Sequence, residues 1–223
     1  MYLNLFSIFD PCTSMLFSLN WISIFMPMFF FPMKFWVIPS YLLMFWNLFI
    51  MLMFNEFKIL MKKFKINLII FITLLIYLML LNLLSLMPYI FTPTSHMSVN
   101  LSLSLILWIS FMLYGWLNFY DSMFIHLLPM NTPVFLMNFM IVIETISNII
   151  RPWTLAIRLT ANMLAGHLLL LLLSSSIKGS YIILVPLIIL AQIFLLILEI
   201  FVSFIQSYVF TILSLLYFNE SNY

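Results

Sequence analysis

The longest stretch of the chain without a charged side chain runs from Ile66 to Tyr120. A helix needs about 20 mostly apolar residues to cross the hydrocarbon core of a bilayer, so this stretch is long enough for two crossings. Its Leu, Ile, Phe and Met residues occur in continuous blocks. The strands of a transmembrane β-barrel would instead alternate apolar and polar residues over roughly 10 positions. The stretch therefore predicts membrane helices and excludes a barrel.

The composition extends this prediction to the whole chain. Of its 223 residues, 66% are apolar and 6% are charged, against about 45–50% and 25% in soluble domains. We therefore predict an all-α integral membrane protein, a single membrane domain over residues 1–223 with about five to six membrane helices. Four further windows lack Asp, Glu, Lys and Arg: Pro11–Met33, Ser122–Ile143, Gly179–Leu198 and Ile200–Asn219.

The first half of the chain predicts three spans and one helix on the membrane surface. In the surface helix, apolar side chains such as Met53, Phe57 and Met61 share one helical face, and lysines occupy much of the rest. Such an amphipathic segment lies in the interface, with its lysines at the lipid headgroups. We expect spans at residues 13–33, 67–87 and 101–120, and the interfacial segment at residues 41–65.

The C-terminal part predicts a helical hairpin of residues 134–173 and 181–218, separated by a Ser-rich turn. A helix of about 38 residues would be about 57 Å long, whereas the hydrocarbon core is about 30 Å thick. These helices must therefore tilt strongly, break, or lie partly in the membrane plane. A strongly tilted hairpin that wraps against a curved partner satisfies this constraint.

Basic residues predict the orientation. Five of the eight are Lys34 and the lysines between Lys58 and Lys65. The positive-inside rule places this segment, and with it the C-terminus, on the side of synthesis. The N-terminus then lies on the opposite side, and its Asp10 and lack of basic residues argue against a cleavable signal peptide.

Several function classes are excluded by what the sequence lacks. Cys12 is the single cysteine, so the chain has no internal disulfide, and three scattered histidines do not make a metal site. There is no phosphate-binding loop, no nucleophile motif and no basic–aromatic patch for nucleic acid. We expect no enzyme activity and no cofactor. His96, Asp121 and His126 fall in predicted loops and are expected to be solvated.

Five ionisable residues lie within the apolar C-terminal part. Charged groups at the centre of a membrane helix cost roughly 2.5–3.5 kcal/mol on insertion scales, so they are functional candidates by default. Structural alternatives remain for each: an ion pair with a neighbouring carboxylate, a solvated position near the lysine side, or simple packing of the histidine. These residues are Glu144, Arg151, Arg158, His167 and Glu199.

Helical spacing groups these residues into faces. The stripe Glu144, Asn148, Arg151, Leu155, Arg158 and Asn162 advances by 4, 3, 4, 3 and 4 residues and shares one face. His167 faces away from that stripe, and Gln192, Glu199, Ser203 and Gln206 share a face of the next helix. Antiparallel packing would make Glu199 a partner of His167. The pattern predicts a protein that moves a proton or cation past a fixed buried arginine.

Arg151 to His167 carries a specific resemblance, in the sequence Arg-Pro-Trp-Thr-Leu-Ala-Ile-Arg-Leu-Thr-Ala-Asn-Met-Leu-Ala-Gly-His. It resembles subunit a of the F-type ATP synthase in its animal mitochondrial form, and the similarity covers essentially the whole chain. Supporting stretches are Asn4–Asp10, Pro88–His96, Phe111–Trp116, Glu144–Asn148 and Gln206–Val209.

The resemblance implies a role for each candidate. Arg158 matches the essential arginine that faces the carboxylates of the c-subunit ring. Glu144 matches an acidic position at the half-channel open to the matrix. The remaining positions match the half-channel open to the intermembrane space: Asn162, His167, Glu199 and Gln206.

The implied setting is the mitochondrial inner membrane, with other membrane-sector and peripheral-stalk subunits, lipid and protons as partners. ATP chemistry would be carried by other subunits. A secondary cation antiporter is the main alternative, although its halves would be related by symmetry. A respiratory-complex subunit related to antiporters, a passive membrane anchor and a membrane hydrolase fit the sequence less well.

Overall fold

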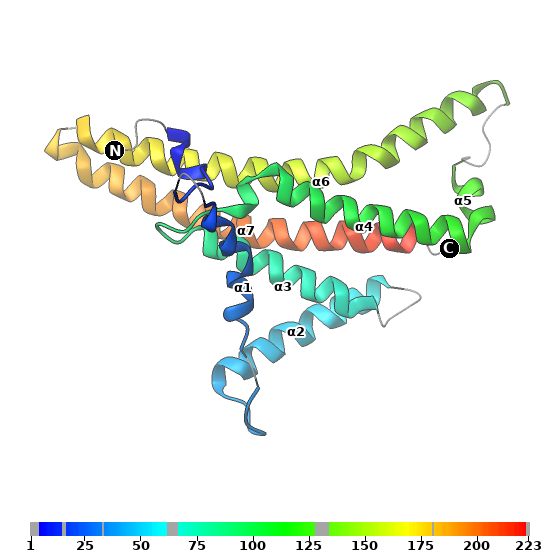
Figure 1. The fold of residues 1–223 in the computed structure, drawn as a ribbon, viewed down its shortest axis with the longest axis horizontal. Helices are drawn as coiled ribbons and strands as arrows, with labels where there is room; N and C mark the ends of the chain where they lie inside the picture. The colour runs from blue at the N-terminus through cyan, green and yellow to red at the C-terminus, as the bar shows by residue number, and fades with distance from the viewer. Residues whose placement is uncertain are drawn as a thin grey trace.

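The computed structural model describes residues 5–14, 17–32, 34–61, 67–127, 134–179 and 181–221. Within these ranges every regular element is helical (Figure 1), which confirms the predicted all-α class. Five of the described helices are long and apolar enough to cross a membrane. They are α2 (Tyr41–Leu60), α3 (Leu68–Ser85), α4 (Met97–Asn118), α6 (Val134–Ser176) and α7 (Val185–Ser221).

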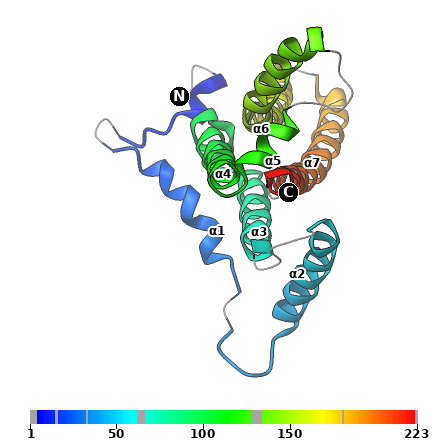
Figure 2. The ribbon, with the colours of Figure 1, turned by 90° about the vertical axis from the view of Figure 1, so that its right-hand side faces the viewer.

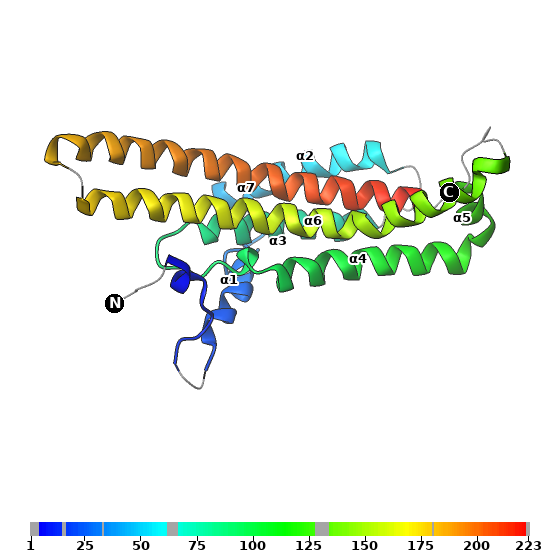
Figure 3. The same cartoon turned by 90° about the horizontal axis from the view of Figure 1, so that it is seen from above.

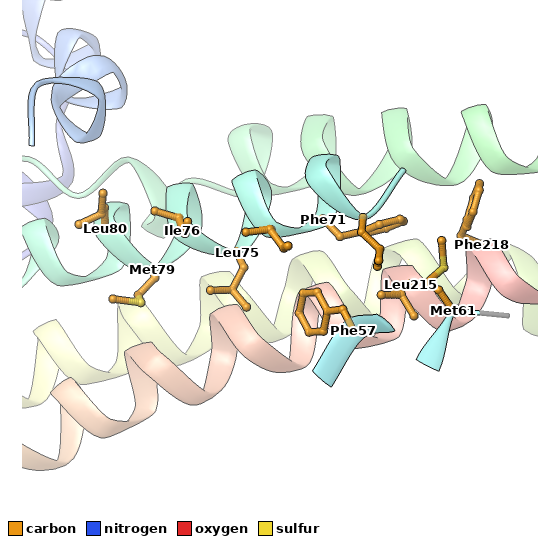
Figure 4. Packing of buried hydrophobic residues seen from close by; sticks show 11 residues of the cluster. Phe57, Met61, Phe71, Leu75, Ile76, Met79, Leu80, Leu215 and Phe218 are labelled. Atoms are coloured by element: carbon orange, nitrogen blue, oxygen red, sulfur yellow. The ribbon is translucent and has the colours of Figure 1, made fainter. Parts of the chain in front are cut away.

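Helix α3 is the centre of the bundle. It lies among α2, α4 and α7 when the molecule is viewed along its length (Figure 2). Its sequence is apolar on nearly every face, as expected for a helix that is covered all round. The main hydrophobic cluster joins α3 to the ends of α2 and α7 (Figure 4). The Phe71 ring, for example, lies 5.8 Å from the Phe218 ring of α7 and 5.9 Å from the Phe111 ring of α4.

The two long C-terminal helices run antiparallel and side by side (Figure 3). With 43 and 37 residues, they are about 65 Å and 55 Å long. Short 3₁₀ turns, η5 (Ile177–Gly179) and η6 (Ile182–Leu184), lie where α6 leads into α7. Pro152 lies inside α6, and Figure 1 shows the first part of that helix turning away from the line of the rest, as proline in a helix promotes.

The buried side of α7 is lined with small hydroxyl residues. Each hydroxyl donates a hydrogen bond to a carbonyl oxygen one turn earlier in the same helix, so the hydroxyl hydrogen is satisfied without help from another helix. Small side chains let helix backbones approach closely in membrane bundles. The residues are Ser203, Ser207, Thr211 and Ser214.

Two long-range hydrogen bonds define the ends of the bundle. Nε2 of His96 lies 2.9 Å from the carbonyl oxygen of Phe9, so the N-terminal segment is held at the loop between α3 and α4. At the other end, Nδ2 of Asn219 donates to the carbonyl oxygen of Leu60 over 2.8 Å. We call this second end the α5 end, because α5 (Tyr120–His126) lies there (Figure 1).

The first predicted span is only partly helical. The structure has η2 (Leu19–Phe25) followed by α1 (Met26–Phe29), a stretch shorter than the expected 13–33 segment. The Thr13 hydroxyl instead donates to the carbonyl oxygen of Phe17, and the Ser14 hydroxyl accepts from the Phe17 N–H. These hydroxyls compete with helical hydrogen bonds and keep the chain out of a helix.

Other segments also differ in extent from the sequence-based expectation. The predicted surface segment 41–65 contains α2, whose length and composition suit a span; residues 62–66 lie outside the described ranges. Residues 67–87 contain α3, and α4 begins at Met97 rather than at residue 101. The hairpin segments 134–173 and 181–218 overlap α6 and α7, but each helix extends three residues beyond its predicted segment, to Ser176 and Ser221.

The expectation for His96 was wrong. It was placed in a solvated loop, but its ring is half-buried, stacks on Phe91 at 5.2 Å and bonds to the Phe9 carbonyl. The apolar N-terminal segment covers this loop, which is why the ring is not free in water. Asp121 is exposed as expected, although it lies in the first turn of α5 rather than in a loop. His126 is the last residue of α5.

Close packing of α7 leads to a first prediction. Ser207 is buried on the hydroxyl-lined side of α7, so Ser207→Leu should force neighbouring helices apart and destabilise the protein by about 1–3 kcal/mol. The measurement is the thermal unfolding of the purified protein or complex. Ser207→Ala, which stays small, is the matched control. Equal melting temperatures for the two variants would contradict close packing at this position.

Candidate functional site

The first part of the site lies where α6 and α7 cross near their connecting turn. The Glu199 side chain comes from α7 and is only 8% exposed. A Cβ atom added to Gly166 of α6 would lie 2.8 Å from both Cδ and Oε1 of Glu199. The carboxyl group therefore rests against the bare backbone of Gly166, beside His167. A Cβ at this position would oblige the Glu199 carboxyl to shift, because the carboxyl occupies the space of a side chain.

Three buried polar atoms in this region have no hydrogen-bond partner among the described residues. They are both carboxyl oxygens of Glu199 and Nε2 of His167. Buried polar atoms are nearly always satisfied by protein or water, and an unpaired buried charge is especially costly. The structure thus brings the two predicted residues to neighbouring places on α6 and α7, but it shows no direct hydrogen bond between them. The atoms are positioned to exchange hydrogen bonds or protons with small molecules such as water.

Arg158 is placed differently. Its side chain is exposed on α6, nine residues before His167. Among the described carboxylates none lies within ion-pair distance of it, although Arg151 on the same helix has two such partners. The alternative that Arg158 is a structural arginine paired inside the chain is therefore not supported. An exposed arginine without a carboxylate at ion-pair distance on a membrane helix is a candidate for pairing with a group from outside the chain.

A second polar region lies at the α5 end. Here a cavity of about 80 Å³ opens between α4, α5, α6 and α7. The Arg151 guanidinium pairs with Glu220 of α7, and its Nη2 lies 3.9 Å from Oε1 of Glu144. The same guanidinium lies 4.9 Å from the centre of the Tyr217 ring. Polar side chains at the cavity include Glu144, Asn148, Arg151, Tyr217, Glu220 and Ser221.

Sequence reasoning missed Glu220 and Tyr217. Glu220 follows the last apolar window and was therefore left outside the membrane segments. The predicted antiparallel hairpin could have indicated Glu220, because in such a hairpin the end of the second helix lies beside the beginning of the first. Among the described residues, Arg151 has two ion-pair partners. Glu144 lies on α6 with it, and Glu220 comes from the end of α7.

The remaining predicted residues lie between the two polar regions. Asn162 and Gln206 are half-buried, on α6 and α7 respectively. The Gly166–Glu199 contact sets the register of the two antiparallel helices. Seven residues further along α7 is Gln206, and seven residues back along α6 is Leu159. Gln206 therefore lies level with Leu159, the neighbour of Arg158 in the sequence. No group of three or more His, Cys, Asp or Glu residues that could hold a metal ion occurs in the described ranges.

Comparison with known proteins decides the family. Residues 13–219 match the family model described as ATP synthase A chain. The chain belongs to the ATP synthase subunit a family. It is 51% identical to ATP synthase subunit a of Apis mellifera ligustica, over 99% of this chain and 97% of that protein. It is also 51% identical to the subunits a of Drosophila melanogaster and Anopheles gambiae, over the full length of each.

Membership confirms the resemblance drawn from residues 151–167. The chain is a multi-pass subunit of the ATP synthase membrane sector, with a role in proton translocation. It is not itself the catalytic subunit, and it works together with other subunits of the complex. The apolar helices are therefore the frame on which the two polar regions and Arg158 are held.

The Gly166 contact yields a second prediction. Gly166→Ala should displace the Glu199 carboxyl and lower proton flux through the ATP synthase by about tenfold, the effect of roughly 1.4 kcal/mol of lost interaction. Gly179→Ala is the matched control, because a Cβ there would meet nothing within 4 Å. Flux is measured by the decay of a pH gradient across reconstituted vesicles. A Gly166→Ala variant as conductive as the control would show that the position of Glu199 does not matter.

Proposed function

We propose that this chain provides two offset half-channels of the mitochondrial ATP synthase and separates them with Arg158. The observation that carries the proposal is the order of groups along α6. The Gly166–Glu199 contact lies toward the hairpin turn, the Glu144–Arg151 region lies at the α5 end, and the exposed Arg158 lies between them. At about 1.5 Å per residue, Arg158 is about 14 Å from His167 and about 21 Å from Glu144 along the helix.

The proposed partner of Arg158 is a carboxylate of the c-subunit ring. A guanidinium group stays protonated at any physiological pH, so Arg158 is a permanent positive charge. It attracts an ionised carboxylate that arrives on the ring and repels a proton that would cross directly between the half-channels. Its exposure on α6, with no ion-pair partner among the described carboxylates, supports this assignment.

In the proposed cycle a proton enters from the intermembrane space and reaches the region of His167, Glu199, Asn162 and Gln206. It neutralises a c-ring carboxylate, which can then face lipid as the ring turns. After nearly a full rotation the carboxylate loses its proton toward the matrix, by way of the cavity at Glu144. The transmembrane potential contributes about 2.3 kcal/mol per charge for each 100 mV.

The proposed orientation places the N-terminus in the intermembrane space, and the C-terminus and the lysine-rich segment in the matrix. The two long-range hydrogen bonds support this assignment. One holds Phe9 to the α3–α4 loop, and the other ties the end of α7 to the end of α2. Lys58, the described member of the lysine group between Lys58 and Lys65, belongs to that end of α2 and therefore lies on the C-terminal side.

A third prediction tests the separator. Arg158→Ala should abolish ATP-driven proton pumping, while passive flux persists in membranes stripped of the catalytic head. Arg158→Lys keeps the charge but loses the planar fork, so strong impairment is expected as well. Pumping is followed with a pH-sensitive dye in reconstituted vesicles.

Ile149→Ala truncates another exposed side chain of α6 and is the control that should still pump. Normal coupled pumping by Arg158→Ala would overturn the proposal. Absence of passive flux from both the wild type and the variant would instead favour a scaffold or antiporter role.

A further inference from the structure

The indole N–H of Trp108 has no hydrogen-bond partner among the described residues. Trp108 lies in the middle of α4, and its side chain is half-buried. Its Nε1 atom is nevertheless fully buried, with no acceptor within hydrogen-bond distance. A buried donor without an acceptor is costly, because it has given up water and gained nothing in return. The surroundings of Nε1 therefore have to supply an acceptor.

Helix α6 offers an acceptor on the side that faces the bundle. Pro152 has no N–H, so the carbonyl oxygen of Asn148, one turn earlier, lacks the donor that an α-helix normally supplies. Pro152 is buried and Asn148 is half-buried, whereas Ile149 and Ile150 between them are exposed. A helical carbonyl points toward the residue four positions later. The carbonyl that the proline leaves free therefore lies on the inner face of α6.

The donor and the acceptor border the same space. Helix α4 packs against α6 (Figure 2). The cavity of about 80 Å³ at the α5 end is lined by Trp108 and by Asn148. A second cavity, of about 10 Å³, is lined by Trp108 and by Pro152. Trp108 thus lies against the bend of α6 itself, beside both turns that the proline separates.

The larger cavity has room for a water molecule between the indole and the helix. One water needs roughly 10–15 Å³ of such space and two to four polar partners. It can accept from Nε1 of Trp108 and donate to the Asn148 carbonyl. The Glu144 side chain lines the same cavity and is a further acceptor. A water-mediated bond of this kind is nearly as favourable as a direct one.

We propose that Trp108 is a positioning residue that holds the bend of α6, by donating through one water molecule to the carbonyl that Pro152 leaves free. The bend sets the direction of the part of α6 before Pro152 (Figure 1), which carries Glu144. Trp108 thereby controls where Glu144 lies relative to Arg158, which follows the bend. The effect on pumping rests on the proposed half-channels, whereas the effect on the bend does not.

A double-mutant cycle tests the link between the indole and the proline. Trp108→Phe removes the N–H and keeps an aromatic ring. Pro152→Ala restores a backbone N–H, which satisfies the Asn148 carbonyl within the helix and leaves Trp108 no acceptor there. ATP-driven proton pumping is measured with the whole complex in reconstituted vesicles, for the wild type, the two single variants and the double variant.

We expect Trp108→Phe to lower the pumping rate about fivefold when Pro152 is present, the fold-change that corresponds to about 1 kcal/mol, or one hydrogen bond. In the Pro152→Ala background the same substitution should cause no further loss. An equal loss in both backgrounds overturns the inference, because the indole would then contribute packing alone. A Trp108→Phe variant that pumps like the wild type overturns it as well.

Trp116 provides the matched control. It lies two turns further along α4 and lines the same cavity of about 80 Å³, but it does not line the cavity that contains Pro152. Whatever the size of its effect, Trp116→Phe should lower pumping by the same factor with and without Pro152→Ala. Coupling of Trp116 to Pro152 as strong as that of Trp108 would overturn a specific role for Trp108.

A distance measurement follows the bend without any proton movement. Spin labels are attached at Phe139 and Leu169, which are both exposed and lie on either side of Pro152. They are about 45 Å apart along the helix. Cys12, the single cysteine of the chain, and the accessible cysteines of the other subunits are first replaced by Ser.

Trp108→Phe should broaden the distribution of distances between the two labels, because the bend is no longer held. Trp116→Phe should leave the distribution as in the wild type. An unchanged distribution in Trp108→Phe overturns the inference, even if Pro152→Ala does not assemble or does not pump.

These results are distinguishable from failure of the proposed half-channels. If Trp108→Phe broadens the distances and Arg158→Ala still pumps, the role of Trp108 at the bend is supported and the half-channels are rejected. If Arg158→Ala abolishes pumping while Trp108→Phe changes neither the distances nor the pumping, only the role of Trp108 is rejected.

Discussion

The antiparallel packing of α6 on α7 is the interaction on which the site depends. Neither helix carries a complete polar region by itself. One crossing places Glu199 against Gly166, and at the α5 end the same pair of helices brings Glu220 to Arg151. A shift of one helix past the other by a single turn, about 5.4 Å, would undo both contacts at once. The small hydroxyl residues on the buried side of α7 help to fix this register, because they leave no bulky side chain to separate the backbones.

The sequence predicted much of the architecture because apolar blocks and charge positions are strong signals in a membrane protein. The apolar stretch from Ile66 to Tyr120 was correctly assigned to two helices, and the Ser-rich segment lies at the turn of the long hairpin. The expected antiparallel packing of the hairpin also placed Glu199 near His167. The role of each of these residues in proton transfer stays a prediction, as do the membrane tilt and the orientation.

What the sequence could not predict depends on contacts between distant segments. The packing of His96 against Phe9 and Phe91 requires the N-terminal segment to fold over a loop, and no local pattern signals that. Glu220 pairs with Arg151 only because the end of α7 returns to the first part of α6. Thr13 and Ser14 use their hydroxyls in local hydrogen bonds to the backbone of Phe17, and such bonds compete with helix although the surrounding composition is apolar.

Gly166 and Glu199 also constrain how this part of the chain can evolve. The space that a Cβ would need at position 166 is filled by the tip of the acid at position 199. A methyl group on α6 can therefore be accepted together with a shorter acid on α7, whereas either change alone leaves a clash or a gap. The two positions, far apart in the sequence, are expected to change as a pair, so the fitness effect of a substitution at one of them depends on which residue occupies the other.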